Sequence, residues 1–312
     1  KKLGAHVREI PFTELRYVDD YSVAALNPIF NIDDFRNIRV SYFTGLFNTK
    51  PAVIERTTKC VLNQTNPNWE WVLYDDSNND ADAERLKKFF ADIGDPRIKY
   101  FNFHSHRGIV GLSKKRAANL CTGDYLAELD HDDLLMPNIT DMILKHGNGF
   151  DFIYSNNASV VVHEDNSFTL GEYFEPGFAM GYGSYRTTLA INPLTVLLHE
   201  YQECIAPPIN PKTIRHIVGV PNHIRVWNKK FYDSIGGHNT NLTVADDYEL
   251  IVRSFLNGGK FLHLDMLGYL QVEDPSRTTY GLNTEIQYLF NAVLANYDYP
   301  IKIEFEKRGM ED

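Results

Sequence analysis

Residues 111–133, GLSKKRAANLCTGDYLAELDHDD, decide how this chain folds. Small and apolar side chains recur at helical spacing from Ser113 to Cys121 and predict a helix. Tyr125–Leu129 then has the pattern of a short buried strand, which runs directly into Asp130-His131-Asp132-Asp133. A helix that leads into a buried strand is typical of a βαβ unit and of a parallel sheet. The stretch therefore predicts an α/β fold with charged groups where a strand ends.

The same alternation of strand and helix patterns extends along the chain in both directions. The expected strands are 38–43, 69–74, 98–103, 224–227 and 261–264, and the expected helices are 52–64, 81–92, 244–256 and a helix from 283 onward. Residues 171–221 are rich in Gly, Pro and Tyr and predict loops and short elements. We therefore expect a Rossmann-like, mostly parallel central sheet flanked by helices, followed by an irregular region.

The composition limits what such a fold can do. The chain has 312 residues, with 31 Lys and Arg against 41 Asp and Glu, so its formal net charge is −10. This balance argues against a general nucleic-acid binder, which needs clustered basic side chains. No run approaches the ~18 consecutive apolar residues of a membrane span, and the N-terminus lacks the apolar stretch of a signal peptide. Three cysteines lie far apart, outside any metal-ligand spacing, which favours a reducing, cytoplasmic location.

Two acidic clusters follow predicted strands. Asp75-Asp76-Ser77 ends the strand at 69–74, and Asp130-His131-Asp132-Asp133 ends the strand at 125–129. In an open α/β sheet, ligands bind where the carboxyl ends of strands converge. Carboxylates this close together repel one another, and a hard cation such as Mg²⁺ or Mn²⁺ relieves the repulsion while also binding a substrate phosphate. The alternative is a solvated turn, in which an Asp caps a helix from Met136 onward.

A third acidic cluster, Asp246-Asp247, stands at the start of the predicted helix 244–256. The helix dipole alone favours Asp at this position. The alternative is a general base, because a partly desolvated carboxylate beside another carboxylate has its pKa raised toward neutrality. Such a group suits removal of a proton from a sugar hydroxyl.

Three stretches in order resemble a known family: NWEWVLYDDSNND at 68–80, the stretch 111–133, and FYDSIGGHNTNLTVADDYELIVRSFLNGGKF at 231–261. The order resembles glycosyltransferase family 2, inverting enzymes of the GT-A fold that use nucleotide-sugar donors. The resemblance implies a GT-A domain at 37–275, divided into a nucleotide-binding half, 37–135, and an acceptor-binding half, 136–275. The flanking segments are an N-terminal extension at 1–36 and a C-terminal helical segment at 276–312.

The resemblance also implies a donor site made of residues that end or follow the predicted strands. Those expected to contact the nucleotide are Thr44 and Gly45 at the base, Asp75 or Asp76 at the uracil edge, Lys114, Lys115, and Asp130 at the ribose. Those expected to hold the Mn²⁺ or Mg²⁺ ion are Asp132 and Asp130, with Asp133 as support. A carboxylate that accepts from the uracil ring N–H favours a UDP-sugar. For the two lysines, a solvated helix face is an equally good interpretation.

Further residues correspond to the catalytic and acceptor side of the family. Asp247 occupies the place of the catalytic base, and Asp246 replaces the usual Glu before it. The acceptor candidates are His223, Trp227 and Tyr182. Where the family often has Tyr-Arg and a later His, this chain has Tyr269–Glu273, with Glu273 as a candidate replacement. The Gln-x-x-Arg-Trp signature of processive synthases is missing from the sequence, so we infer transfer of a single sugar.

These patterns favour a metal-dependent inverting glycosyltransferase that moves one sugar from a UDP-sugar to a hydroxyl of a glycan, protein or lipid. One alternative is a catalytically inactive nucleotide- or glycan-binding protein of the same fold, which the fold alone does not exclude. The retained Asp247 and the Asp130/Asp132 pair argue against it. The other alternative is a sugar nucleotidyltransferase. That class normally has a Gly-rich, basic phosphate loop after its first strand, where this chain has Thr44–Asn48.

Overall fold

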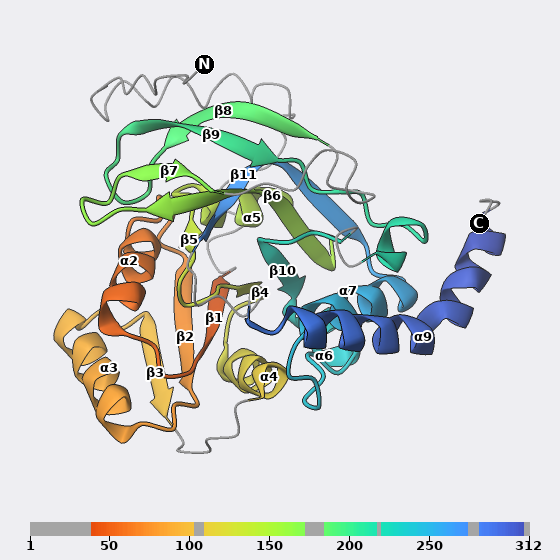
Figure 1. The fold of residues 1–312 in the computed structure, drawn as a ribbon, viewed down its shortest axis with the longest axis horizontal. Coiled ribbons are helices and arrows are strands. Elements are labelled where there is room, and N and C mark those ends of the chain that lie inside the picture. The colour runs from red at the N-terminus through yellow and green to blue at the C-terminus, as the bar shows by residue number, and fades with distance from the viewer. Residues whose placement is uncertain (1–38, 103–108, 172–183, 217–219, 274–280, 309–312) are drawn as a thin grey trace.

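The computed structural model describes residues 39–102, 109–171, 184–216, 220–273 and 281–308, so the extension expected at 1–36 lies outside the described residues. In the first half, strands and helices alternate as predicted: β1 (Val40–Leu46), α2 (Pro51–Leu62), β2 (Trp69–Asp75), α3 (Asp80–Ile93), β3 (Ile98–Asn102), α4 (Val110–Leu120) and β4 (Tyr125–Glu128). The four strands pair in parallel in the order β3-β2-β1-β4 (Figure 1). The predicted α/β, Rossmann-like architecture is therefore confirmed for this half.

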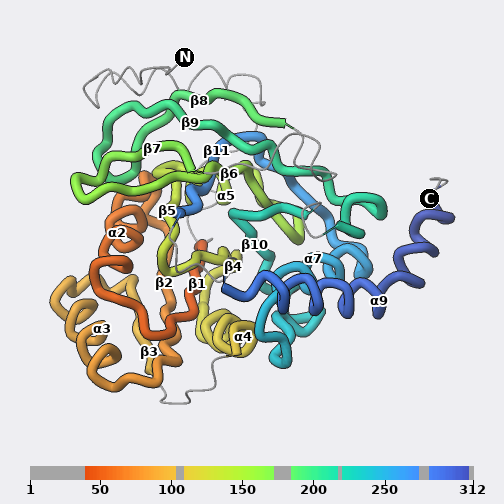
Figure 2. The backbone as a smooth tube through the Cα atoms, viewed as in Figure 1, coloured from red at the N-terminus to blue at the C-terminus, as the bar shows by residue number. Residues whose placement is uncertain are grey.

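The second half extends the same sheet with strands of both directions. Its elements are β5 (Leu134–Leu135), α5 (Ile139–His146), β6 (Phe152–Val162), β7 (Phe168–Leu170), β8 (Tyr185–Ile191), β9 (Leu198–Cys204), η3 (Thr213–Arg215), β10 (Arg225–Asn228), α6 (Lys229–Ser234), α7 (Asp246–Leu256), β11 (Phe261–Val272) and α9 (Asn283–Lys307). Strand β10 lies antiparallel between β4 and β6, and the order continues to β11 and β5. Figure 2 shows α9 running past α7 and out beyond the rest of the described chain.

Three local predictions are wrong. Residues 171–221 contain the hairpin β8–β9 and not only loops and short elements. No residue of β8 is buried, and its sequence YRTTLAI lacks the apolar alternation that marks a half-buried strand. The first strand continues to Leu46, so Thr44 and Gly45 lie inside β1 and not in a loop after it. The helix expected from Met136 begins at Ile139, because Leu134–Leu135 pair with β11 as a short strand.

The core has two parts, one on each face of the sheet. Successive side chains of a strand point to opposite faces, so Tyr42 packs in one part and Phe43 in the other. The first part includes Leu86 of α3 and Ile143 of α5, and the second includes side chains of α4, α7 and α9. Burial of these apolar surfaces holds the helices on both faces and fixes the edge where the strands end.

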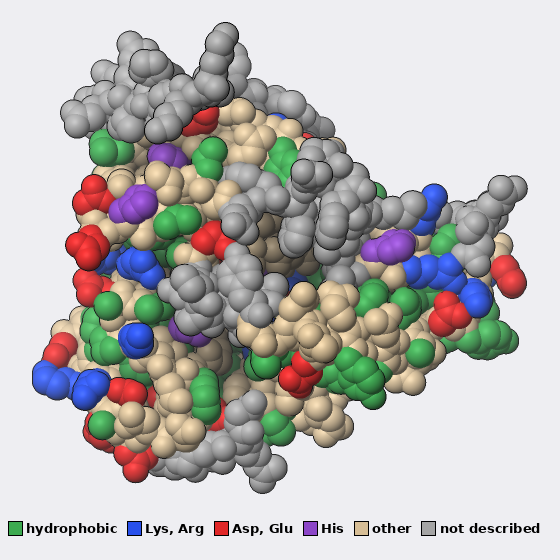
Figure 3. All heavy atoms as spheres, viewed as in Figure 1, with side chains coloured by type: hydrophobic (Ala, Val, Ile, Leu, Met, Phe, Trp, Pro, Cys, Tyr) green, Lys and Arg blue, Asp and Glu red, His purple; other side chains and the backbone are tan. Residues whose placement is uncertain are grey.

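The surface of the described chain carries charges of both signs. In Figure 3, Lys and Arg side chains are interspersed with Asp and Glu over the face in view. Among the helices that the structure describes, none combines the length and the apolar character that crossing a bilayer requires.

A buried glutamate stabilises the amino-terminal end of the parallel strands through hydrogen bonds to neighbouring segments. Glu70 of β2 is 1% exposed and accepts hydrogen bonds from the Ser41 hydroxyl (2.6 Å), the Thr122 hydroxyl (2.9 Å) and the Lys99 ammonium. Burial acts to raise the pKa of Glu70, but these donors outweigh it and lower the pKa from 4.5 to about 2. The carboxylate therefore stabilises the fold in its ionised form.

We predict that this stabilisation is lost in acid. Because the folded pKa is the lower one, the contribution is complete above pH 4.5 and falls as the pH drops toward 2. Between pH 6 and pH 3 the parent protein should lose about 2 kcal/mol of unfolding free energy that the Glu70→Gln variant does not lose. Urea denaturation at both pH values measures the difference. An equal pH dependence in the two proteins would contradict this role for Glu70.

Candidate active site at the carboxyl ends of the strands

Charged side chains from four elements meet where β4 ends. Glu128 is the last residue of β4, and Lys114 reaches it from α4. Arg225 comes from β10, and Asp246 and Asp247 begin α7. This is the edge of the sheet at which an open α/β fold binds its ligands.

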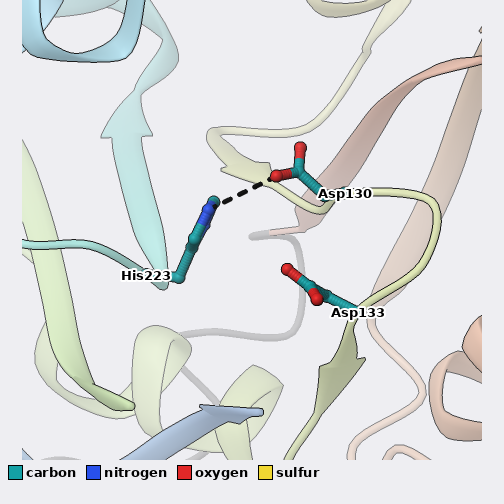
Figure 4. A group of neighbouring side chains, drawn as sticks. All are labelled: Asp130, Asp133 and His223. Carbon is teal, nitrogen blue, oxygen red and sulfur yellow. Dashed lines mark ion pairs between the residues drawn. The ribbon is translucent and has the colours of Figure 1, made fainter. Parts of the chain in front are cut away.

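Asp130, Asp133 and His223 form a group that could hold a metal ion. Each offers one ligand atom, and the three atoms lie within 4.8 Å of one another. Figure 4 shows the three side chains converging, with His223 Nε2 3.4 Å from Asp130 Oδ2. Two carboxylate oxygens and one imidazole nitrogen suit a divalent ion such as Mn²⁺. Asp132, which the resemblance assigns to the metal, is not a member of this group; it lies on the partly exposed turn between β4 and β5.

Neighbours from β11 orient this group. The Tyr269 hydroxyl donates to Asp133 Oδ2 (3.0 Å), and the backbone N–H of Val272 donates to Asp133 Oδ1 (2.8 Å). The Tyr269 ring stacks on His223, with centroids 4.4 Å apart. Asp133 is 4% exposed, so the solvated-turn interpretation does not apply to it. Tyr269 thus contacts a member of the group, whereas the carboxylate of Glu273, the candidate replacement, accepts from the Ser159 hydroxyl.

Lys114 neutralises part of the negative charge. Its ammonium contacts Glu128 and lies 3.6 Å from Asp246 Oδ2 and 4.0 Å from Asp130 Oδ1. Burial opposes the charge, but the three carboxylates outweigh it and raise the pKa of Lys114 well above its ordinary value. For Asp130, burial would raise the pKa, but Lys114 and His223 hold it below its ordinary value. Both groups are therefore charged at neutral pH.

Arg225 is the second buried cation. Its Nη2 donates to Glu128 Oε1 (3.2 Å) and lies 2.8 Å from His223 Nε2, while its Nη1 donates to Asp247 Oδ2. Burial and Arg225 lower the pKa of His223, so its imidazole is neutral and suited to bind a metal. The sequence analysis missed Glu128 and Arg225. A charged residue at one end of each of the short strands YLAE and RVWN is the signal that marks them.

The two aspartates that begin α7 differ in exposure. The Asp247 side chain is 32% exposed, whereas that of Asp246 is 4% exposed. Burial raises the pKa of Asp246 above its ordinary value. Burial would also raise the pKa of Asp247, but Arg225 and Lys114 outweigh it and lower the pKa. Asp247 is thus ionised and reachable, and Asp246 is enclosed.

The site has an excess of negative charge. Two permanent cations, Lys114 and Arg225, face five carboxylates: Glu128, Asp130, Asp133, Asp246 and Asp247. Within the described residues, the buried atoms Glu128 Oε2, Asp246 Oδ2 and His238 Nε2 lack hydrogen-bond partners. His238 Nε2 lies 3.8 Å from the first and 3.6 Å from the second. A bound cation would relieve such an imbalance.

Several expected site residues belong to the packing instead. The Thr44 hydroxyl donates to the Leu129 carbonyl (2.6 Å) and accepts from Trp71 Nε1 (2.8 Å), so it is fully engaged inside the sheet. Trp227 is 0% exposed and its indole N–H donates to Ser254, which leaves no ring face for an acceptor. The expected role of Trp227 is therefore wrong.

The remaining candidates fall in different places. Lys115 donates to the Gly236 carbonyl (2.8 Å). The Asp75 carboxylate is fully buried and accepts from Ser77 and Tyr100. Asp76 follows β2 directly, and its backbone N–H donates to the Leu46 carbonyl (2.9 Å). Tyr182 lies outside the described residues.

Comparison with known proteins agrees with this geometry. The family model described as Glycosyl transferase family 2 matches residues 42–192. A crystal structure of S. aureus TarS in complex with UDP-GlcNAc superimposes with a TM-score of 0.56 at 14% sequence identity, covering 83% of this chain and 67% of that one. The fold is therefore that of GT-A glycosyltransferases, as the resemblance implied.

Curated relatives are similar over much of the chain. The Escherichia coli UDP-Glc:alpha-D-GlcNAc-diphosphoundecaprenol beta-1,3-glucosyltransferase WfgD is 26% identical over 185 residues, which is 58% of this chain and 61% of WfgD. The Escherichia coli chondroitin synthase is 23% identical over 253 residues, which is 80% of this chain but 30% of the synthase. The chain thus spans less than two thirds of either relative. Its residues 42–192 match glycosyl transferase family 2, in agreement with the resemblance seen in the sequence.

We predict that Lys114 is a structural counter-ion. Lys114→Ala should lower the free energy of unfolding by about 3–5 kcal/mol at pH 7, because it removes the ammonium beside Asp246 and leaves Arg225 as the remaining permanent cation beside Glu128. Lys115→Ala, the next position on the same helix, is the matched control and should cost about 1 kcal/mol or less. Urea denaturation followed by circular dichroism measures both. Equal losses would contradict the prediction.

Proposed function

We propose that the chain is a metal-dependent, inverting glycosyltransferase that moves one sugar from a UDP-sugar to an acceptor hydroxyl of a glycan, protein or lipid. The observation that carries the proposal is the convergence of Asp130, Asp133 and His223 beside the reachable carboxylate of Asp247. A metal group and a base side by side match the needs of a reaction in which a diphosphate leaves and a hydroxyl attacks. The match of residues 42–192 to glycosyl transferase family 2 supports the same reaction class.

The donor set supports a divalent ion. Asp130, Asp133 and His223 would hold it, and the excess of carboxylates around them would be balanced by its charge. When bound, the ion would neutralise the leaving diphosphate. The mixed oxygen and nitrogen ligands favour Mn²⁺ over Mg²⁺, which prefers oxygen ligands alone.

A uridine donor is supported by the acidic turn after β2. Asp75 already serves Ser77 and Tyr100, so we assign the contact with the uracil ring N–H to Asp76. WfgD carries UDP-Glc in its name, and TarS has been crystallised with UDP-GlcNAc. Lys114, beside Asp130, offers a cation within reach of a donor phosphate.

Asp247 is the proposed general base. It is ionised and 32% exposed, whereas Asp246 is enclosed, with its Oδ2 3.6 Å from both Lys114 Nζ and His238 Nε2. A base must first lie within reach of the acceptor hydroxyl, and its pKa matters only after that. Attack from the side of Asp247, opposite the leaving diphosphate, would invert the anomeric carbon.

We predict metal-dependent binding of UDP. Calorimetric titration in Mn²⁺ should give higher affinity than titration in excess chelator, and GDP should bind more weakly than UDP in both. Asp130→Asn should lose most of the metal-dependent part, because it removes a carboxylate ligand. Asp165→Asn, an exposed carboxylate bound to Ser167, is the control and should behave as the parent. Equal UDP affinity with and without metal would rule out the metal site.

We also predict that Asp247→Asn keeps UDP affinity and lowers kcat by about 10²- to 10⁴-fold, because the loss is that of a general base. Asp246→Asn should lower kcat less. Turnover is measured as UDP release, and NMR of the product should show an inverted anomeric configuration. UDP binding without turnover in the parent would favour the inactive binding protein, and retained configuration would contradict the mechanism.

A further inference from the structure

We propose that Arg225 is a positioning residue that holds the carboxylate of Asp247 in its reactive orientation, and that Glu128 anchors Arg225 from the neighbouring strand. The inference rests on the proposed function, in which Asp247 is the base. It adds two residues that are not expected to touch donor or acceptor. Both lie inside the sheet, and they act through the side chain that does the chemistry.

The pairing of β4 with β10 brings the first two residues together. Glu128 and Arg225 are direct partners in this antiparallel pair, so their side chains project from the same face within reach of each other. Arg225 Nη2 donates to Glu128 Oε1 at 3.2 Å. The Glu128 side chain is 1% exposed and the Arg225 side chain is 4% exposed. Because neither charge can turn toward water, each needs buried partners, and each is a partner of the other.

The Arg225 guanidinium, held by Glu128, in turn restricts the orientation of the Asp247 carboxylate. Its donors lie in a rigid plane, so fixing the Nη2 arm on Glu128 also fixes the direction of the Nη1 arm. Nη1 donates to Asp247 Oδ2, and the backbone N–H of Tyr248 donates to Asp247 Oδ1 (2.7 Å). Both oxygens of Asp247 are therefore held, although the side chain is 32% exposed. A carboxylate with this exposure would otherwise sample several rotamers.

Glu128 has a second contact that defines the rival explanation. The same oxygen, Oε1, also accepts from Lys114, which lies beside Asp130. A variant at Glu128 could therefore weaken donor binding through Lys114 and leave Asp247 untouched. The two routes differ in the kinetic constant that they change, since a misplaced base lowers kcat and a weakened donor site raises KM.

The test is a double-mutant cycle between Glu128 and Asp247. UDP release is measured in Mn²⁺ with whichever of UDP-glucose and UDP-N-acetylglucosamine raises the melting temperature more. Glu128→Ala should lower kcat about 10- to 100-fold, because small misplacement of a reacting group has effects of that size, and should change donor KM less than about 3-fold. In the Asp247→Asn background, Glu128→Ala should cause no further loss.

Conservative variants keep the test decisive if Glu128→Ala does not fold. Glu128→Gln keeps an oxygen that accepts from Arg225 Nη2, so it should recover most of the lost kcat. Arg225→Lys keeps the charge but cannot hold Glu128 and Asp247 at once, so it should lose kcat as Glu128→Ala does.

Glu70→Ala is the matched control. It removes another buried, lysine-paired glutamate at the opposite end of the strands, and it should lower the melting temperature while kcat stays at the parent value.

The outcomes separate the inference from the proposed function. If Asp247→Asn turns over at the parent rate, the proposed base is wrong and the inference fails with it. If Asp247→Asn loses activity but the loss from Glu128→Ala is fully additive, only the positioning role is overturned. A change confined to donor KM would assign Glu128 to donor binding through Lys114 and would also overturn the positioning role.

Discussion

The balance of charge at the end of β4 is the constraint on which the rest of the site depends. Burying carboxylates is costly unless cations or hydrogen-bond donors compensate them. Lys114 and Arg225 supply two positive charges from different elements, one from a helix and one from a strand. Their positions require α4 to pack against β1 and β2, and β10 to lie beside β4. The charge balance of the site therefore depends directly on the order of the strands and on the packing of α4.

The antiparallel strand β10 brings charged side chains to the candidate site from a second direction. The parallel strands β1, β2 and β4 deliver acidic turns at their carboxyl ends, as open α/β sheets do. Strand β10 enters beside β4 from the opposite direction, so its first residue, Arg225, meets Glu128, the last residue of β4. His223 precedes it and faces Asp130. A parallel strand at this place would present its C-terminal residues to the site instead.

Sequence patterns predict the parts of this protein that depend on neighbours in the chain. The alternation of strands and helices, the acidic turns and the family resemblance all follow from local runs, and Asp130, Asp247 and Lys114 indeed lie at the common edge. The patterns do not show which charged residue is paired across the sheet. Glu128 and Arg225 stand 97 residues apart, and only the register of β4 with β10 joins them. Trp227 illustrates the converse, because an aromatic near the site is buried core once its strand is central.

The close approach of α4 to β1 has a consequence for the reach of Lys114. Gly45 lies under the helix, and a Cβ atom there would stand 3.3 Å from the Ser113 Cβ, which is tighter than ordinary van der Waals contact. Ser113 is the residue before Lys114, so the missing side chain sets how deeply the ammonium can enter the acidic cluster. The distance between α4 and β1 thus sets the distance between the Lys114 ammonium and the carboxylates, and with it the electric potential at the site. Gly45→Ala would push α4 away from β1 and move the Lys114 ammonium. It would therefore change the electric field at the carboxylates without altering any charged residue.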